Sequence, residues 1–418
     1  MKSGIHFLNL LRNCATCRIS STAIILSLVL FLSNISTSAI AQNLNTNHQN
    51  TSDIEELLIK ALNELQHQRI DNALQSMETL VNKKPHFKLA QLIYADLLQA
   101  RTQGITDFGA NSGVSKNIIT ALRQEARQRW QHHVNTPEVG KIPSNLLYTD
   151  KKYKHIIVVD LKTSRLYIFD SGSTYPRIVS DYYISSGKKG AVKQKSGDKK
   201  TPLGVYYVTK HISDKKLPDF YGTGAYPINY PNDWDKRLGK TGYGIWLHGT
   251  PTDTYSRPPL ASDGCVAMSN SDFSALKPFI KVGKTPVVIT NGIDWLDQDK
   301  WLEEQESFFS LLKQWEQDWE SLKTSRYLAH YSKSFKSNNK KSYWGWAKHK
   351  KQVNKNKTFI KVELSDISMY RYPGAKNTIV INFKQQYKSN NYKQIANKRQ
   401  YWQREKDGHW RIIYEGPA

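Results

Sequence analysis

The sequence predicts a multidomain protein in which an α-helical region, a mostly-β domain and an α+β domain follow one another. Its 418 residues allow two or three folded units, because a typical domain takes about 100 to 200 residues. Apolar residues recur at helical spacing between Asp53 and Ala100. From His155 the pattern changes to one typical of strands, and after Trp295 a helical pattern returns before a last group of strands.

The N-terminus has the features of a signal peptide. Three basic residues precede an apolar run from Ala23 to Leu32, and small residues follow up to an Ala-x-Ala cleavage site that ends at Ala41. An uncleaved membrane anchor is the alternative, but the apolar run is about half as long as a bilayer-spanning helix of ~20 residues. We therefore expect a signal peptide at residues 1–41 and an exported mature chain without a transmembrane span.

Cleavage at this site would leave one cysteine in the mature chain. Cys14 and Cys17 lie before the apolar run, whereas Cys265 follows it. Thiols usually pair in an oxidising compartment, so an unpaired thiol there is either a buried, inert side chain or a reactive group. The residues around Cys265 favour the second interpretation.

The chain is strongly basic, with a formal net charge of +24 at pH 7. In a cytoplasmic protein this charge would suggest nucleic acid as a partner. An exported protein instead meets the cell wall, its carboxylate-bearing peptides and lipid headgroups. We interpret the charge either as electrostatic retention near these polyanions or as solvation of the surface, and expect no nucleic-acid partner.

The helical region is expected at residues 42–150. The run Arg69–Leu74, with Pro85 after it, resembles part of a tetratricopeptide repeat, whose copies must stack to be stable. A helical hairpin that packs on the next domain is the alternative. Pro137 and Pro143 mark a linker at the end of this region.

The mostly-β domain is expected at residues 151–294. Ile156–Val159 and Leu166–Phe169 flank a turn and predict a hairpin. The loop Lys188–Lys200, which contains six lysines, is expected to be exposed and mobile. Further strands are expected at Ile178–Ser185, Gly204–Thr209, Gly244–Leu247 and Pro286–Thr290.

The α+β domain is expected at residues 295–418. An apolar stripe between Trp295 and Tyr331 predicts a core-facing helix, and a polar, basic stretch follows at Ser332–Lys357. The residues Tyr401-Trp402 and Trp410 resemble the last two strands of the nuclear-transport-factor-like cone fold, which hosts many functions. The expected strands are Thr358–Tyr370, Thr378–Tyr387, Lys398–Glu405 and Trp410–Glu415.

One segment of the mostly-β domain combines residues suited to nucleophilic catalysis. His248-Gly249 ends an apolar strand, and Cys265 follows 17 residues after the histidine. A thiol becomes an effective nucleophile when an imidazole takes its proton, because the thiolate is the attacking species. Gly264 would let backbone N–H groups approach a substrate oxygen, as an oxyanion hole requires.

This segment resembles the YkuD-type L,D-transpeptidases, whose signature is His-Gly, a gap of about this length, and Ser/Thr-x-Gly-Cys. The run Thr201–Tyr206 is similar to the family's upstream Thr-Pro-x-Gly strand, and the resemblance covers about residues 153–291. It implies that Cys265 is the nucleophile and His248 its general base, with the backbone carbonyl of Gly249 orienting the imidazole.

The resemblance also implies that Ser262, Asp263 and Gly264 shape the loop that presents the thiol and its oxyanion hole. The sequence departs from the family at Asp263, where His, Asn or Arg is usual, and at Ala267, where an arginine is common. Another basic residue would have to replace that arginine, and the candidates are Arg257 and Lys240.

The implied activity is that of a peptidoglycan L,D-transpeptidase in cell-wall biogenesis and cell shape, located in the periplasm or cell envelope. Cys265 would attack the third residue of a stem peptide and release D-alanine. The acyl acceptor would be an amine of a stem peptide, a D-amino acid or a wall-attached lipoprotein.

Two alternatives stay open. Water as acceptor at the same site would give an L,D-carboxypeptidase or an amidase that releases wall-bound lipoprotein. A non-enzymatic cell-wall-binding scaffold is the alternative from another class. No cofactor is expected, and no metal site, because the sequence lacks clustered ligands of the His-Glu-x-x-His kind.

Overall fold

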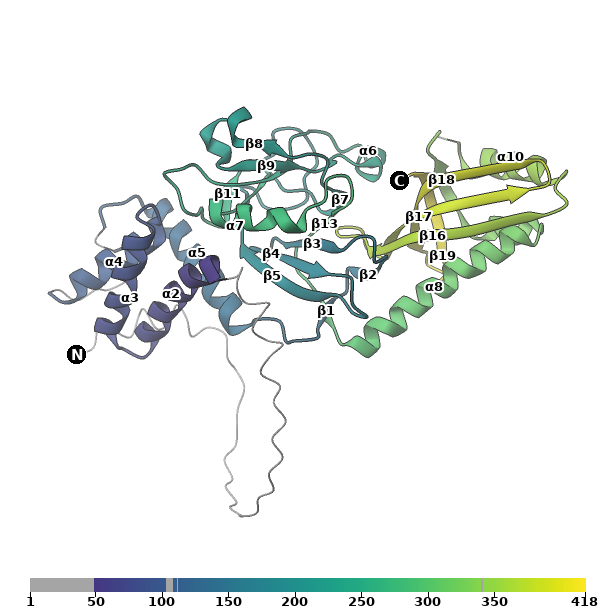
Figure 1. Cartoon of the computed structure of the whole chain (residues 1–418). Coiled ribbons are helices and arrows are strands. Elements are labelled where there is room, and N and C mark those ends of the chain that lie inside the picture. Colours follow the sequence, from purple (N-terminus) through teal and green to yellow (C-terminus); the bar gives the residue numbers. More distant parts are fainter. Residues whose placement is uncertain (1–48, 103–107, 111, 340) are drawn as a thin grey trace, which may run out of the picture.

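The computed structural model describes residues 49–102, 108–110, 112–339 and 341–418, and the expected signal peptide lies outside them. Helices form one side of the molecule, a sheet-rich domain lies in the middle, and a long helix with a large sheet forms the other side (Figure 1). The predicted multidomain fold class is confirmed. Within the described part of the chain, no helix has both the length and the apolar character needed to cross a membrane.

The helical part is built from helices that bury their apolar stripes against one another. Neighbouring helices pack side by side, and their buried side chains include Leu58, Met77 and Ile93. This shared core explains why the helices are stable, since short helices are marginal in isolation. The tetratricopeptide resemblance stays a prediction. The helices are α2 (Gln49–Gln66), α3 (Ile70–Lys83), α4 (Lys88–Ala100) and α5 (Lys116–Val134).

The segment expected as a linker contributes strands to other parts of the protein. Strand β1 (Ile142–Pro143) pairs with β14 (Trp295–Leu296), so Trp295 lies in a strand and not in the expected helix. Strand β2 (Leu146–Thr149) pairs with β16 (Ile360–Arg371) of the C-terminal sheet. The chain thus contacts its C-terminal part before it enters the central domain.

A five-stranded mixed sheet forms the centre of the middle domain. Its strand order is β5–β4–β3–β13–β7, and β3 and β13 run parallel to each other. The residues Ile156–Val159 and Val287–Ile289 are fully buried because apolar clusters cover both faces of the sheet. The strands are β3 (His155–Asp160), β4 (Arg165–Asp170), β5 (Arg177–Tyr183), β7 (Gly204–Tyr207) and β13 (Pro286–Thr290).

Two smaller sheets carry the His248 and Cys265 segments. The four-stranded sheet has the order β12–β10–β9–β8, and β11 (Leu260–Ser262) pairs with β6 (Ser186–Gly187) in the other. The strands of the four-stranded sheet are β8 (Ile212–Ser213), β9 (Gly224–Pro227), β10 (Trp246–His248) and β12 (Val266–Ala267). The short helices of this domain are α6 (Asp233–Arg237), α7 (Asn270–Leu276) and the 3-10 turns Asp214–Lys216, Asp219–Tyr221 and Lys277–Phe279.

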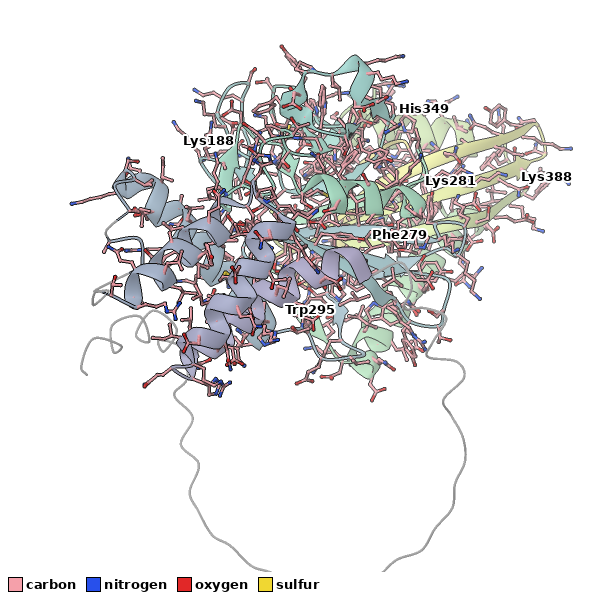
Figure 2. The ribbon with its side chains drawn as sticks, turned by 60° about the vertical axis from the view of Figure 1, so that its left-hand side comes forward. Lys188, Phe279, Lys281, Trp295, His349 and Lys388 are labelled. Atoms are coloured by element: carbon pink, nitrogen blue, oxygen red, sulfur yellow. The ribbon has the colours of Figure 1, made fainter. Side chains whose placement is uncertain are left out.

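The lysine-rich loop Lys188–Lys200 was expected to be exposed, but part of it is buried. Asp198 accepts hydrogen bonds from Lys193 Nζ at 2.7 Å and from the backbone N–H of Gln194, also at 2.7 Å. Lys193 is 3% exposed. Lys188 at the start of the loop does reach the surface (Figure 2). A single carboxylate therefore organises the loop, although lysines dominate its composition.

The C-terminal part packs helices on one face of a six-stranded sheet of order β15–β19–β18–β17–β16–β2. Trp315, Phe383 and Trp402 are among the side chains of the core between them. The polar stretch after Tyr331 contains a strand and a helix that the sequence did not reveal, because few of their residues are apolar and buried. The elements are α8 (Gln298–Glu320), α9 (Thr324–Ala329), α10 (Tyr343–Asn354), β15 (Tyr331–Ser337), β16, β17 (Thr378–Ser389), β18 (Tyr392–Arg404) and β19 (Trp410–Pro417).

The opposite face of this sheet packs against the middle domain. Trp234 of α6 stacks on Tyr401 of β18, with ring centroids 4.7 Å apart and planes inclined by 14°. Asn232 Nδ2 donates to the Tyr372 hydroxyl at 3.1 Å. The two domains thus share an apolar and hydrogen-bonded interface.

Candidate active site

His248 lies at the end of β10, where its side chain is only 1% exposed. Its Nδ1 lies 2.6 Å from the backbone carbonyl oxygen of Gly249. A carbonyl oxygen only accepts hydrogen bonds, so Nδ1 carries the proton and Nε2 is the nitrogen that can accept another. The local backbone thereby selects the tautomer that a general base needs.

The surroundings of His248 favour the neutral imidazole. The ring of Tyr221 lies edge-on at 5.1 Å between centroids, and the ring of Phe220 lies at 6.1 Å. Burial lowers the pKa of His248 to about 4, with a further lowering by Arg257, although the bond to Gly249 acts in the opposite direction. The imidazole is therefore uncharged at neutral pH.

Cys265 is half-buried directly before β12. Strand β12 runs parallel to β10, with Val266 beside Leu247, so the cysteine and the histidine lie on neighbouring segments. The Cys265 thiol donates to the carbonyl oxygen of Gly244, with a sulfur–oxygen distance of 3.3 Å. Burial, together with the charge of Asp263, raises the pKa of this thiol to about 11. The resting site therefore contains a neutral thiol and a neutral imidazole.

The turn before Cys265 depends on Ser262 and Gly264. Ser262 Oγ donates to the Cys265 carbonyl at 2.6 Å and accepts from the Gly264 N–H at 3.1 Å. Gly264 has φ of +125°, and a Cβ there would come within 2.7 Å of the Lys200 carbonyl oxygen. Only glycine fits this position. The Gly264 amide is already hydrogen-bonded and so is not free to bind a substrate oxygen.

Asp263 lies at the surface of the same turn. It is exposed, and its carboxylate pairs with Lys188 Nζ at 3.3 Å. An exposed pair of this kind contributes little stability. Asp263 makes no hydrogen bond with the sulfur, and it acts on the Cys265 thiol through its charge.

Asn270 is a residue whose importance the sequence reasoning missed. Its Oδ1 accepts the backbone N–H groups of Thr223 and Thr250, at 3.1 and 3.2 Å, and its Nδ2 donates to the Thr250 carbonyl at 2.8 Å. A Cβ on Gly249 would come within 2.1 Å of Asn270 Oδ1. This close approach is a second reason for glycine after His248, and only the tertiary structure reveals it.

The two candidates for the missing arginine have different surroundings. Arg257 lies over the Phe220 ring at 4.4 Å, and its charge favours the thiolate form of Cys265. Lys240 instead pairs with the fully buried Asp235 at 2.9 Å. Arg257 is therefore the better placed cation for binding an anionic substrate group.

The helical part holds the loop that carries Arg257. Glu125 of α5 accepts a hydrogen bond from Ser256 Oγ at 2.6 Å. The Tyr255 N–H donates to the His86 carbonyl at 3.2 Å, and the Tyr255 ring packs on Phe87 with centroids 4.7 Å apart. The helices thus support the candidate site from outside the central domain.

Two parts of the chain match known domain families. Residues 154–289 match the YkuD model, described as an L,D-transpeptidase catalytic domain, and residues 307–416 match the Cds6 C-terminal NTF2-like domain. No curated protein sequence matches the chain.

Two solved proteins are similar to this chain over nearly their whole length. Bd1075 of Bdellovibrio bacteriovorus is 28% identical, with a TM-score of 0.59 over 66% of this chain and 98% of that chain. Pgp2 of Campylobacter jejuni, described as a helical cell shape determining protein, is 27% identical, with a TM-score of 0.54 over 66% of this chain and 95% of that chain. The central domain of the present chain thus belongs to the YkuD family of L,D-transpeptidase catalytic domains, and the C-terminal domain to the NTF2-like domains of the Cds6 type.

Proposed function

We propose that the protein is a cysteine-dependent L,D-transpeptidase that acts on peptidoglycan stem peptides. The observation that carries the proposal is the neutral His248 ring, whose Nδ1–H is held by Gly249 while Cys265 lies on the adjacent segment. Membership of the central domain in the YkuD family supplies the substrate class.

In this mechanism His248 Nε2 takes the proton of the Cys265 thiol while the sulfur attacks the carbonyl carbon of the third stem residue. The new C–S bond replaces the C–N bond to D-alanine, whose amine leaves with the proton returned by His248. The acceptor amine then attacks the thioester carbon and gives a proton to His248. The new C–N bond replaces the C–S bond, and the sulfur takes the proton from His248, which restores the thiol. The Gly249 carbonyl stabilises the imidazolium that forms transiently.

Ser262 and Gly264 hold the turn that presents the Cys265 sulfur. Asp263, at the surface of this turn, raises the pKa of the thiol through its negative charge. Because the Gly264 amide is occupied, other N–H groups of the turn must bind the substrate oxygen. This division of roles rests on the hydrogen bonds of Ser262.

We place this activity in the cell envelope. The support is the signal-peptide pattern at residues 1–41, a substrate class that lies outside the cytoplasm, and the likeness to a helical cell shape determining protein. We further propose that the mature chain consists of a helical region at 42–150, a catalytic domain at 151–294 and an accessory domain at 295–418. A wall-attached lipoprotein is one proposed acyl acceptor.

The test is to incubate the mature protein with a disaccharide tetrapeptide and to record the masses of the protein and the products. A Cys265-linked acyl adduct with loss of D-alanine supports the proposal, and Cys265→Ala is the control. A crosslinked product identifies a transpeptidase, whereas a free tripeptide identifies a carboxypeptidase. Neither adduct nor product, with tetrapeptide or lipoprotein-linked muropeptides, would favour the wall-binding scaffold.

Arg257 is expected to bind a carboxylate of the substrate. Its replacement in Arg257→Ala should raise KM by about 10- to 100-fold with little change in kcat, because a hydrogen bond to a charged group contributes about 1.5 to 3 kcal/mol. Steady-state D-alanine release measures both constants. Arg177→Ala, at an exposed arginine of β5, is the control. An unchanged KM in Arg257→Ala would exclude this role.

The pKa of Cys265 predicts an unusual pH dependence of alkylation. Because that pKa is raised to about 11, the thiol is protonated at pH 7, and the thiolate fraction grows as the pH rises toward 11. Iodoacetamide should therefore react slowly at pH 7 and progressively faster up to pH 10, followed by protein mass. A rate that is already maximal near pH 7 would indicate a thiolate–imidazolium pair instead.

A further inference from the structure

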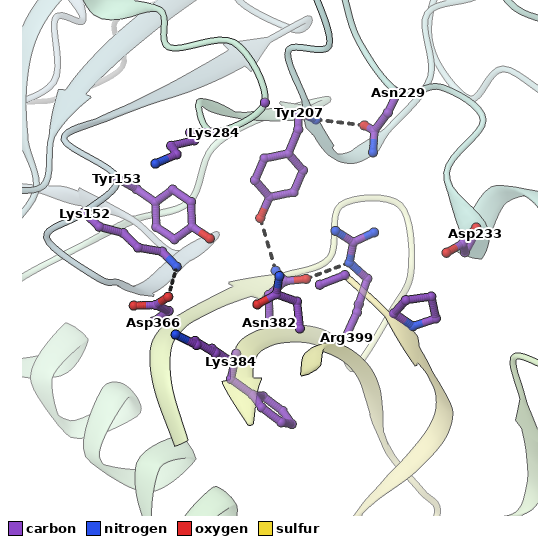
Figure 3. A pocket seen from close by; sticks show the side chains of 15 residues that line it. Lys152, Tyr153, Tyr207, Asn229, Asp233, Lys284, Asp366, Asn382, Lys384 and Arg399 are labelled. Carbon is purple, nitrogen blue, oxygen red and sulfur yellow. Dashed lines mark hydrogen bonds and ion pairs between the residues drawn. The ribbon is translucent and has the colours of Figure 1, made fainter. Parts of the chain in front are cut away.

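A cavity of about 580 Å³ lies between the catalytic domain and the C-terminal sheet. Its lining includes Tyr207, Asn229 and Lys284 from the first domain and Asn382, Lys384 and Arg399 from the second (Figure 3). None of its lining residues belongs to the candidate active site. Its volume lies within the range of small-molecule sites, about 300 to 1,000 Å³.

Arg399 is the most informative residue of this cavity. It is 8% exposed, and its Nε donates to Asn382 Oδ1 at 2.6 Å. Asn382 Nδ2 in turn lies 3.2 Å from the Tyr207 hydroxyl, so residues of both domains fix the guanidinium. Among the described residues, none accepts a hydrogen bond from the two terminal nitrogens, and Figure 3 shows them on the side of Tyr207. These two nitrogens therefore face the cavity and are free to bind an anion that enters it.

The other charges of the cavity favour an anion. Lys152 is neutralised by Asp366 at 2.6 Å. Asp233 pairs with Lys236 at 3.6 Å, and its charge also acts on Arg399. Within the described chain, Lys284 and Lys384 have no carboxylate within 4.0 Å and add positive charge at the rim.

The neutral groups indicate what accompanies the charge. Asn229 Oδ1 accepts the Tyr207 N–H at 2.8 Å, which leaves its Nδ2 as a donor toward the cavity. The rings of Tyr153 and Tyr207 supply apolar surface beside it. An amide next to a carboxylate would find complementary groups here, as at the end of a peptide.

We propose that this cavity binds the carboxylate of a small, peptide-like ligand on Arg399. The planar guanidinium presents parallel N–H groups that match the two oxygens of a carboxylate. Asn229 donates to the adjacent carbonyl, and Lys284 and Lys384 attract the anion. Because both domains contribute, an occupied site stabilises their interface.

The probe for this site is N-acetylglycine, titrated by NMR into the full mature chain. The Arg257→Ala background weakens carboxylate binding at the candidate active site, so the result does not depend on the proposed reaction. We expect saturable binding that Arg399→Lys weakens at least tenfold. The double variant Lys284→Gln/Lys384→Gln should weaken it less and flatten its salt dependence. Lys388→Gln, an exposed lysine of the same strand as Lys384, is the matched control (Figure 2).

Three results would overturn the proposal. One is the absence of saturable binding, and another is binding that neither Arg399→Lys nor the lysine double variant changes. Equal affinity for inorganic phosphate would exclude a carboxylate site. If Arg399→Lys fails to fold, the double variant decides, because both lysines are free of ion pairs within the described chain.

Discussion

Loss of D-alanine release is the expected result of replacing either member of the Cys265 and His248 pair. Cys265→Ala removes the nucleophile and should leave no acyl adduct and no turnover above background. His248→Gln should lower kcat by about 10²- to 10⁴-fold, which is the usual contribution of a general base. The loss should be large because the resting thiol is protonated and cannot attack without transferring its proton.

The histidine variant needs a control that separates chemistry from folding. His211→Gln changes an exposed histidine of the same domain and should leave activity unchanged. Thermal unfolding should show similar stability for all three variants. A His248→Gln enzyme within a few-fold of the wild-type rate would mean that another group takes the proton.

Much of the fold could be predicted because the local pattern and the tertiary environment agree. Ile156–Val159 and Pro286–Thr290 have the apolar, β-branched composition of buried strands, and both lie in the central sheet. The sequence could not show that β3 and β13 are parallel neighbours, because their pairing joins segments far apart in the chain. The strand β2 was missed for the same reason, since its partner β16 follows more than 200 residues later.

In the candidate site, too, local features could be predicted from the sequence and contacts between distant segments could not. The residues His248-Gly249 and Gly264-Cys265 could be read from the sequence because their chemical types and spacing are distinctive. Asn270 could not, because its three bonds to backbone groups are made across the fold by a side chain common in loops. The hydrogen bond from the Gly264 amide to Ser262 could not be predicted either, because it depends on the conformation of the turn.

Arg129 of α5 is the residue whose loss should most affect stability. Its guanidinium lies 3.0 Å from Glu125, 3.4 Å from Glu55 and 3.8 Å from the centre of the Tyr183 ring, and the residue is 4% exposed. Glu55 also binds Arg165 of β4, so the cluster joins the helices to the catalytic domain. Arg129→Ala would leave Glu125 buried without a cation, and breaking a buried pair costs about 3 to 5 kcal/mol.

The pH dependence of stability should change with this substitution. Although burial opposes it, the charges of Arg165 and Arg129 lower the pKa of Glu55 from 4.5 to about 2. The resulting stabilisation is fully present above pH 4.5 and is lost as the pH falls toward 2. In Arg129→Ala the pKa of Glu55 should rise, so the free energy of unfolding should depend less on pH between these values. Urea unfolding at several pH values measures this change.

The same substitution should also affect catalysis through the loop of Arg257. Glu125 holds Ser256, and without Arg129 the carboxylate has no cation to keep it in place. We expect KM to rise in the same direction as in Arg257→Ala, with a smaller effect on kcat. Arg127→Ala, an exposed arginine of the same helix, should change neither stability by more than about 0.5 kcal/mol nor KM. If Arg129→Ala destabilises the protein but leaves KM unchanged, the helices stabilise the catalytic domain without positioning its substrate-binding loop.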